Sequence, residues 1–476
     1  MLRTPLTKFV LRPLAAVLAV VMLVGSTSVF AQDNKGKAPA KLPDFIPAGY
    51  DDHQHLQTQL GITKLRMGQN SKVADMLTEE AANPYQATMP ELMVFKDGTK
   101  VTTPGQWLKR RAEIVEDFER EIYGRIPKNV PPVKWQVVSA VDGESGGIAT
   151  VTKTLAGQVD NTAFPEITVT IQASITVPKN AAGKLPILLQ FGGGLGGVGR
   201  PPQAGTKPWT QQAIEHGWAY GTINPNSIQG DNSRLREGIV GLTNKGQPRS
   251  PEDWGSLRAW AWGVSRLIDF FETNPDSGVD PTKVCITGVS RYGKAALVTT
   301  AFETRIAAGF IASSGAGGAK LFRREFGERL ENLTAGNEYH WMAGNFLKYA
   351  AEESSFGKKT VADLPVDQHQ LIALCAPRLC FISYGVVSAG DSKWMDAHGS
   401  FMAGVLAGPA YRMLDKKDLG TPGNYLTDSM PAVSTLIGGE LAWRQHDGGH
   451  TNVPNFPTFF DWAGHYISSP GLLKKE

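Results

Sequence analysis

Gly288-Val-Ser-Arg-Tyr-Gly-Lys294 is the stretch of sequence that decides the fold. The apolar residues 284–287 precede it, and residues 295–298, which predict a helix, follow it. A strand, a tight turn flanked by glycines and a helix together present a serine on a strained elbow with its hydroxyl exposed. Ser290 is therefore the candidate nucleophile, although the second glycine comes three residues after it rather than two.

Strand and helix patterns alternate on both sides of this elbow. A helical period predicts a helix that opens at Thr103, another that Asp253 caps at its N-terminus, and a last one over 459–467. Strands that alternate with helices form a mostly parallel sheet covered on both faces, so we expect an α/β-hydrolase fold, a three-layer αβα sandwich. The predicted strands are residues 133–141, 167–177, 186–191, 218–223, 284–287, 307–312, 379–384 and a segment near Leu441.

The overall composition is that of a soluble globular enzyme. The chain has 476 residues, of which 41% are hydrophobic and 20% charged. Its net charge of +3 equals the three basic residues of the first 31, which contain no acid, so the rest is neutral. Nothing in this balance suggests a nucleic acid or an anionic membrane as a partner, and we expect a monomer.

The N-terminus has the pattern of a secretory signal over residues 1–31. Arg3, Lys8 and Arg12 form a positive region before an apolar run of residues 14–24, and Val29-Phe-Ala31 forms a cleavage site before Gln32. An uncleaved anchor is the alternative. We expect a secreted or periplasmic protein with a linker and N-terminal extension over residues 32–81 and a catalytic domain over 82–476.

Three cysteines remain in this exported chain, Cys285, Cys375 and Cys380. The last two flank a four-residue segment at a strand start, an awkward geometry for a disulfide, so three buried thiols are expected. No spacing of Cys and His indicates zinc, and we expect neither a metal nor a cofactor.

The base of a triad should be a histidine on a loop near the C-terminus, because this fold carries its triad in the order nucleophile, acid, base. His450 fits, since it ends the turn Asp447-Gly-Gly-His450 before the last predicted helix. His446 is the nearby alternative. Weaker candidates are His369, His398 and His465.

The acid should follow the strand at 379–384 and orient the histidine. That loop offers Asp391 and Asp396, and Asp447 is a third candidate. Either of the first two could instead cap the helix that starts near Ala397, so the sequence leaves the choice open.

Two cations flank the candidate nucleophile. The backbone N–H of Arg291 is in the position of an oxyanion donor and its guanidinium adds positive charge, with a salt bridge at the top of the sheet as the alternative. Lys294 lies one helical turn after Ser290. It either faces the cleft of the candidate nucleophile or is a solvated residue on the helix surface. The glycine-rich residues 192–197 offer further backbone N–H donors. These residues also match the glycine spacing of a dinucleotide-binding motif, but the helix and the acidic residue that this motif needs do not follow them.

At this point the sequence resembles the glucuronoyl esterases of carbohydrate esterase family 15, in its bacterial form. The elbow Gly-Val-Ser-Arg-Tyr-Gly-Lys is similar to that family's Gly-Cys-Ser-Arg-x-Gly-Lys, with Val289 in place of the cysteine. Further similar segments follow in order. They are 107–113, 123–127, 314–318, 364–369, 376–378 and 444–450.

The resemblance implies hydrolysis of esters between (4-O-methyl-)glucuronic acid of glucuronoxylan and lignin alcohols. Carried over by position, Ser290 is the nucleophile, His450 the base and Arg291 the oxyanion stabiliser. Lys294, Glu338 and Trp394 would bind the sugar. No cofactor is implied.

One position departs from the family pattern. Where many members carry the triad glutamate, just before Ser-Gly-Ala-Gly-Gly, this chain has Ser313. The resemblance then places the acid in the later loop, at Asp391 or Asp396. Two alternatives follow: an acetyl xylan esterase or other carboxylesterase of this fold, and a carbohydrate-binding pseudoenzyme that has lost its acid.

Overall fold

The structure is a computed structural model that describes residues 42–70, 78–192 and 207–472. The predicted signal segment, residues 1–31, and the glycine loop from residue 193 onward lie outside the described residues. The chain divides into two compact units, residues 1–44 and 45–476, and the sheet and the candidate site lie in the second.

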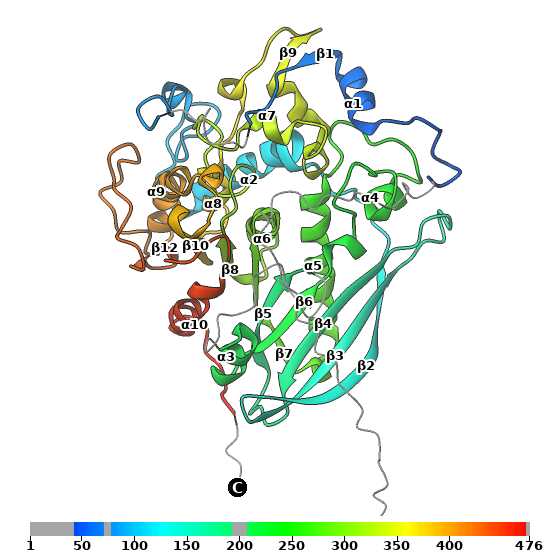
Figure 1. Ribbon diagram of the computed structural model, residues 1–476, viewed down its shortest axis with the longest axis vertical. Coiled ribbons are helices and arrows are strands. Elements are labelled where there is room, and N and C mark those ends of the chain that lie inside the picture. Colours follow the sequence, from blue (N-terminus) through cyan, green and yellow to red (C-terminus); the bar gives the residue numbers. More distant parts are fainter. Residues whose placement is uncertain (1–41, 71–77, 193–206, 473–476) are drawn as a thin grey trace, which may run out of the picture. The chain divides into compact units, whose positions relative to one another are not determined.

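A ten-stranded sheet forms the centre of the second unit (Figure 1), in the order β11-β12-β10-β8-β7-β5-β6-β4-β3-β2. Neighbours from β12 to β6 pair in parallel, and antiparallel pairs complete both edges. The strands are β2 (Val133–Ser145), β3 (Ile148–Val159), β4 (Thr170–Pro178), β5 (Leu185–Phe191), β6 (Ala219–Ile223), β7 (Val279–Val289), β8 (Ile306–Ala312), β10 (Leu379–Tyr384), β11 (Ile437–Gly438) and β12 (Leu441–Gln445).

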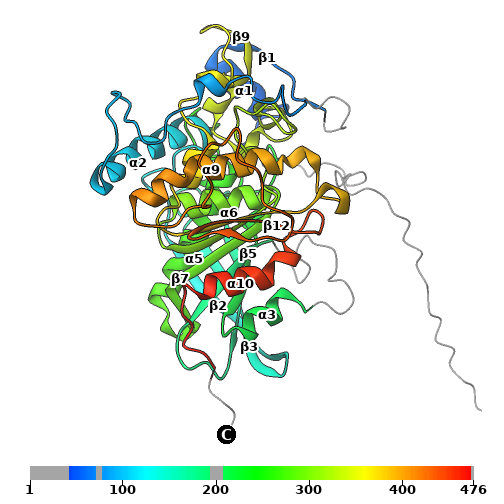
Figure 2. The same ribbon diagram turned by 90° about the vertical axis from the view of Figure 1, so that its left-hand side faces the viewer.

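Helices cover both faces of this sheet, as the sequence predicts. Alternate residues of a strand point to opposite faces. On β10, Leu379 and Phe381 accordingly join the apolar cluster under α3 and α10, whereas Cys380 and Ile382 join the larger cluster on the other side. Figure 2 shows α3 and α10 on one side of the sheet and α6 and α9 on the other. The helices are α1 (Asp52–Leu60), α2 (Pro104–Phe118), α3 (Trp209–Glu215), α4 (Gly238–Thr243), α5 (Ser256–Thr273), α6 (Arg291–Phe302), α7 (Leu330–Leu333), α8 (Gln368–Ala373), α9 (Ala397–Met413) and α10 (Phe456–Gly464).

Helix α2 begins where its sequence predicts. The Thr103 side chain accepts from the Gln106 N–H while the Gln106 side chain reaches back to Thr103, which completes a capping box. Its apolar residues Trp107, Ile114 and Phe118 are fully buried. The chain turns away at Gly124, where a Cβ would lie 2.3 Å from Asp253 O.

Three predictions about secondary structure need correction. Asp253 does not cap α5: Gly255 does, because a Cβ there would lie 2.3 Å from Trp341 O, and the Asp253 carboxylate accepts from Ser250 N–H instead. The last helix starts three residues earlier than expected, at Phe456, and ends at Gly464. Strand β3 was not predicted, although its apolar and polar residues alternate.

The segment before the predicted catalytic domain packs as part of the same unit. Asp51 caps α1, and Gly61 ends it in the left-handed conformation at φ 67°. The next residues form β1 (Ile62–Leu65), which pairs antiparallel with β9 (Ala351–Ser354). Both strands lie at the top of Figure 1.

A further prediction concerns the thiols. Cys285, Cys375 and Cys380 are free and buried, which confirms the expected three thiols. Across residues 42–70, 78–192 and 207–472, no helix combines the length and the apolar character that crossing a membrane requires.

Candidate active site

Ser290 lies at the sharp turn between β7 and α6, as the elbow pattern predicts. Its backbone has φ 62° and ψ −128°, a conformation that costs a non-glycine residue about 1–3 kcal/mol. The Ser290 N–H donates to Ala312 O of the neighbouring strand at 3.0 Å, which fixes the turn. The elbow therefore holds the serine at the carboxyl end of the parallel strands, where ligands bind in α/β folds.

The two glycines of the elbow are required by close packing. A Cβ at Gly288 would lie 2.3 Å from Tyr292 O. A Cβ at Gly293 would lie 2.4 Å from Ala312 O, because the first turn of α6 presses against the end of β8. This contact explains why the second glycine stands three residues after Ser290.

His450 and Asp391 form the hydrogen bond of a triad. His450 Nδ1 and Asp391 Oδ1 are 2.7 Å apart, and since a carboxylate only accepts, the ring nitrogen donates. This bond fixes the tautomer whose Nε2 is free to take a proton. Asp391 is buried, whereas the His450 side chain retains 32% of its exposure.

Each carboxylate oxygen of Asp391 accepts two hydrogen bonds. Oδ1 accepts from His450 and from Ser392 N–H at 2.8 Å, and Oδ2 accepts from Ser313 Oγ–H and Gly385 N–H, both at 2.7 Å. Burial acts to raise the pKa of Asp391, but these hydrogen bonds, led by His450, outweigh it and hold the pKa below its usual value. Ser313, where the family pattern carries glutamate, thus supports the carboxylate in the later loop.

Backbone and side-chain bonds bring the histidine loop to the nucleophile strand. Asn452 Nδ2 donates to Thr287 Oγ1 of β7 at 3.2 Å. Within the loop, His446 Nδ1 accepts from Gly448 N–H at 3.0 Å, so its Nε2 donates to Thr451 O at 2.8 Å. Burial lowers the pKa of His446, which therefore serves as a neutral scaffold for the loop that carries His450.

The other histidines considered from the sequence lie elsewhere. His369 is buried and bonds to Pro90 O at 3.0 Å, and burial lowers its pKa to about 4. His398 pairs with Glu79 at 3.0 Å. His465 is exposed just after α10.

Asp396 has a different set of partners. It caps α9 with φ 50°, and its Oδ1 accepts from Gly399 N–H at 3.0 Å. Its Oδ2 accepts from Arg324 Nε at 2.8 Å, and both side chains are 1% exposed. Asp447, the third candidate, is exposed. The structure therefore brings Asp391, rather than these two, to His450.

Arg291 makes the ion pair that was considered as an alternative to its oxyanion role. Its Nη1 donates to Asp231 Oδ2 at 2.7 Å, and its side chain is half exposed. Asp231 Oδ1 also accepts from His340 Nε2 at 2.9 Å and from Trp341 Nε1 at 2.6 Å. The backbone N–H of Arg291 takes no part in this network, so the pairing is compatible with a backbone oxyanion donor.

Lys294 is buried and its three N–H donors are engaged. Nζ donates to Ser314 O at 2.9 Å, Ala316 O at 2.6 Å and Glu328 Oε2 at 2.8 Å. Since an ammonium has only three donors, a sugar hydroxyl would have to replace one of these bonds. The sugar-binding role of Lys294 therefore stays a prediction, and Glu328 is the partner that the sequence analysis missed.

Glu338 is held in a polar setting beside these cations. Its Oε2 is buried and has no hydrogen-bond partner among the described residues. Burial and then the charge of Glu328 raise the pKa of Glu338 to about 7, while Lys294 and Arg291 lower it. A buried carboxyl oxygen without a partner is a position that a ligand hydroxyl can satisfy.

Trp341 borders the two cations, and Trp394 contacts the carboxylate residue that pairs with Lys294. Trp341 has Arg291 at 5.7 Å and Lys294 at 5.6 Å from its ring, which are cation–π distances. Trp394 is half-buried, and its carbonyl accepts from Glu328 N–H at 2.9 Å, so the loop that carries the acid also touches the Lys294–Glu328 pair.

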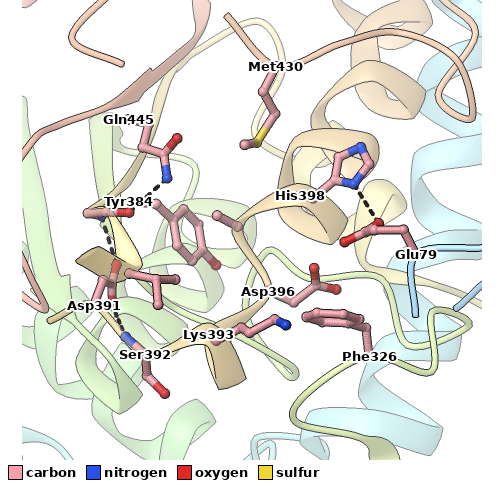
Figure 3. A pocket seen from close by; sticks show the side chains of 13 residues that line it. Glu79, Phe326, Tyr384, Asp391, Ser392, Lys393, Asp396, His398, Met430 and Gln445 are labelled. Carbon is pink, nitrogen blue, oxygen red and sulfur yellow. Dashed lines mark hydrogen bonds and ion pairs between the residues drawn. The ribbon is translucent and has the colours of Figure 1, made fainter. Parts of the chain in front are cut away.

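A pocket of about 170 Å³ opens on the acid loop (Figure 3). Lys393, Glu79 and His398 contribute polar groups to its wall, and the last two lie 3.0 Å apart. Ser290 and His450 are not among the residues that line it. The described lining consists of Glu79, Phe326, Tyr384, Gly385, Val387, Asp391, Ser392, Lys393, Asp396, Ala397, His398, Met430 and Gln445.

In the described part of the chain, no three or more His, Cys, Asp or Glu side chains gather in a way that would hold a metal ion. The described residues do include the groups of nucleophilic catalysis: Ser290 on an elbow, the pair of His450 and Asp391, and two paired cations.

A sequence model of the family described as "Glucuronyl esterase, fungi" matches residues 162–414, more than half of the chain. The chain belongs to this glucuronoyl esterase family. The elbow, with Arg291 and Lys294 beside Ser290, lies within the matched residues. The membership confirms the resemblance stated from the sequence, together with the α/β-hydrolase fold.

Individual relatives support the same membership. A solved glucuronoyl esterase of carbohydrate esterase family 15 from Teredinibacter turnerae T7901 is 35% identical with a TM-score of 0.78, over 87% of this chain and 99% of that one. The carbohydrate esterase MZ0003 from an unknown prokaryotic organism is 30% identical over 82% of this chain and 92% of its own length. A 4-O-methyl-glucuronoyl methylesterase from Podospora anserina is 30% identical over 66% of this chain and 57% of its own length.

Proposed function

We propose that this protein is a serine esterase that hydrolyses esters of (4-O-methyl-)glucuronic acid. The observation that carries the proposal is the 2.7 Å bond between His450 Nδ1 and Asp391 Oδ1, in a chain whose elbow presents Ser290. Family membership narrows the ester, since relatives bear the name 4-O-methyl-glucuronoyl methylesterase. A fold alone does not fix a substrate, so the substrate class rests on the site and the family together.

The reaction follows from the positions of these groups. Ser290 Oγ attacks the uronate carbonyl carbon while His450 Nε2 takes its proton, and Asp391 stabilises the imidazolium that forms. The Arg291 N–H, one residue after the nucleophile, donates to the oxyanion. The alcohol leaves with the proton from His450, and water then hydrolyses the acyl-enzyme by the same steps.

The sugar is proposed to bind beside the two cations. Glu338 offers an unpartnered carboxyl oxygen to a hydroxyl, and the Trp394 ring offers an apolar face to a pyranose. Lys294 and Glu328 would exchange one of their bonds for a second hydroxyl. In this proposal the polar contacts surround the sugar ring, and the ester carbonyl faces Ser290.

The natural substrate is proposed to be the ester that joins glucuronoxylan to lignin alcohols. Such a polymer lies outside the cell, which agrees with the signal segment predicted over residues 1–31 and with a secreted or periplasmic monomer. In this proposal residues 32–81 form a linker and extension and residues 82–476 the catalytic domain.

The test is the hydrolysis of benzyl glucuronate by the wild type and by Ser290→Ala. We expect turnover by the wild type and a loss on the order of 10⁴-fold or more in the variant, because the nucleophile is removed. Ser265→Ala, which removes a hydroxyl of α5 that donates to Ala261 O and also bonds to Glu303, is the matched control and should keep wild-type activity. Equal rates for Ser290→Ala and the wild type would overturn the assignment.

An esterase of broader range, such as an acetyl xylan esterase, is the second candidate. It is favoured by the general name of the relative MZ0003, which specifies only a carbohydrate esterase. Comparing kcat/KM for acetylated xylan with that for benzyl glucuronate separates the two. The bond between Asp391 and His450 weighs against a pseudoenzyme, and labelling of Ser290 by a fluorophosphonate tests this directly.

A further inference from the structure

The positive charges beside the candidate nucleophile are each matched by a carboxylate. Arg291 Nη1 lies 2.7 Å from Asp231 Oδ2, and Lys294 Nζ lies 2.8 Å from Glu328 Oε2. Glu338 adds a further carboxyl group whose buried oxygen has no described partner. The site therefore contains two cations and at least as many acidic groups, so it has no surplus positive charge to offer an anion.

Burial explains only one of these two pairs. The Lys294 side chain is 2% exposed, and a buried ammonium needs a partner because its desolvation is costly. The Arg291 side chain is 50% exposed, so water reaches its charge and the desolvation cost is smaller than that of Lys294. The carboxylate of Asp231 is thus not needed to keep Arg291 in place, which suggests that it has another role.

Asp231 is itself firmly held. Arg291 donates to Oδ2, while His340 Nε2 and Trp341 Nε1 donate to Oδ1 at 2.9 and 2.6 Å. Burial opposes its ionisation, but the donated hydrogen bonds outweigh burial and lower the pKa of Asp231 well below its usual value. Asp231 consequently carries a full negative charge next to Arg291 throughout the neutral pH range.

The proposed reaction changes the charge of its ligand. The substrate is a neutral ester, and its hydrolysis releases an alcohol and a uronic acid that ionises to a carboxylate at neutral pH. An unpaired guanidinium binds a carboxylate strongly, through charge-assisted and often paired hydrogen bonds. An unpaired Arg291 would therefore bind the product more tightly than the substrate and slow its release.

We propose that Asp231 gives this site its preference for the neutral ester over the anionic uronate product. It does so by neutralising Arg291 and occupying its Nη1 donor, so that the product carboxylate gains no free cation on forming. Asp231 acts through Arg291 and is a positioning residue rather than a catalytic one. This proposal rests on the proposed function and concerns the release step of that reaction.

The experiment compares the affinities of one site for the ester and for its acid. In the inactive Ser290→Ala background, dissociation constants are measured for methyl glucuronate and for glucuronate, with and without Asp231→Asn. Asparagine keeps the shape of aspartate, and its oxygen can still accept from His340 and Trp341. We expect glucuronate to bind about tenfold more tightly to the double variant, with the ester affinity changed about twofold or less.

In the active enzyme, Asp231→Asn should lower the ratio of the inhibition constant of glucuronate to the KM of benzyl glucuronate, again by about tenfold. High salt should reduce the effect, because it screens the exposed Arg291 charge. Asp231→Glu, which keeps the charge, should retain the wild-type ratio. Glu237→Gln is the matched control: it removes a carboxylate that pairs with Arg234 in the same segment and should alter neither affinity.

An unchanged ratio of acid to ester affinity in Asp231→Asn, in an enzyme that still turns over esters, would overturn this proposal alone. An equal weakening of both ligands would also overturn it, because that outcome indicates a purely structural role. Absence of ester turnover by the wild type would instead overturn the proposed function, and this inference with it.

Discussion

Asp391 and Asp396 lie five residues apart on one loop, both buried, and they serve different purposes. Asp391 accepts from His450, while Asp396 accepts from Arg324 and caps α9. Each carboxylate is therefore defined by donors from distant parts of the chain. The difference shows that a position close to the start of a helix does not determine what an aspartate does. Its role depends on which donor, distant in sequence, its carboxylate contacts.

The sharpest way to test this comparison is to neutralise Asp391. Asp391→Asn replaces one acceptor oxygen with an amide NH2 group that faces a pair of donors, and it removes the negative charge that stabilises the His450 imidazolium. We expect kcat for benzyl glucuronate to fall on the order of 10³- to 10⁴-fold with the fold retained. Asp447→Asn, an exposed change in the histidine loop, is the control and should stay within about twofold. Activity of Asp391→Asn within tenfold of wild type would contradict the assignment.

Asp396→Asn should give the opposite profile, with stability lost and catalysis kept. Asparagine is an equally good N-cap and tolerates positive φ, so the change isolates the charge beside the buried Arg324. We expect a loss of about 2 kcal/mol in the free energy of unfolding, measured with urea. The kcat of the folded enzyme should change by about twofold or less, and a larger loss of kcat would mean that the two aspartates share one role.

Ser313→Ala tests how far the function of Asp391 depends on the hydrogen bond that the Ser313 hydroxyl donates to it. The change removes the 2.7 Å donor to Asp391 Oδ2 and keeps the backbone preference of a non-glycine residue at φ 40°. With one donor fewer, the carboxylate attracts the imidazolium more strongly, so the acid limb of the kcat/KM profile should move to higher pH. We expect kcat to fall about tenfold with KM nearly unchanged.

The control for this change is Ser383→Ala, which removes another buried hydroxyl that accepts from Asn455 rather than bonding to Asp391. It should leave the pH profile in place. A Ser313→Ala enzyme that loses stability but keeps the wild-type pH profile would show that Ser313 only fills space.

Local patterns were enough to predict the elbow and most of the sheet. The strand before Ser290, the glycines at 288 and 293 and the helix after them all follow from short-range sterics and periodicity. The capping box at Thr103 is equally local. Strand β3 was missed although its residues alternate, because Lys153 and Gly157 interrupt the apolar set that Val151, Leu155 and Val159 form.

The partners of the site residues could not be predicted in the same way. Asp391 lies 78 residues from Ser313 and 59 from His450, and Arg324 lies 72 residues from Asp396. Asp231 follows β6 at the carboxyl end of a parallel strand, a position that marks site residues in this fold, yet only the structure pairs it with Arg291. Contacts over such separations depend on the completed sheet.

The smallest expected effect concerns how the free energy of unfolding changes as the pH falls. It tests whether Asp391 is held as a buried anion. Its folded pKa is lowered, so its ionised form stabilises the protein above the unfolded pKa of about 3.9, and this stability is lost as pH falls through the folded pKa. The stability gap between wild type and Asp391→Asn should therefore narrow between about pH 6 and pH 3. Urea unfolding at both pH values measures the gap. A gap that stays constant or widens toward acid would mean that Asp391 is not held as an anion, and the triad would lose the charge that stabilises its imidazolium.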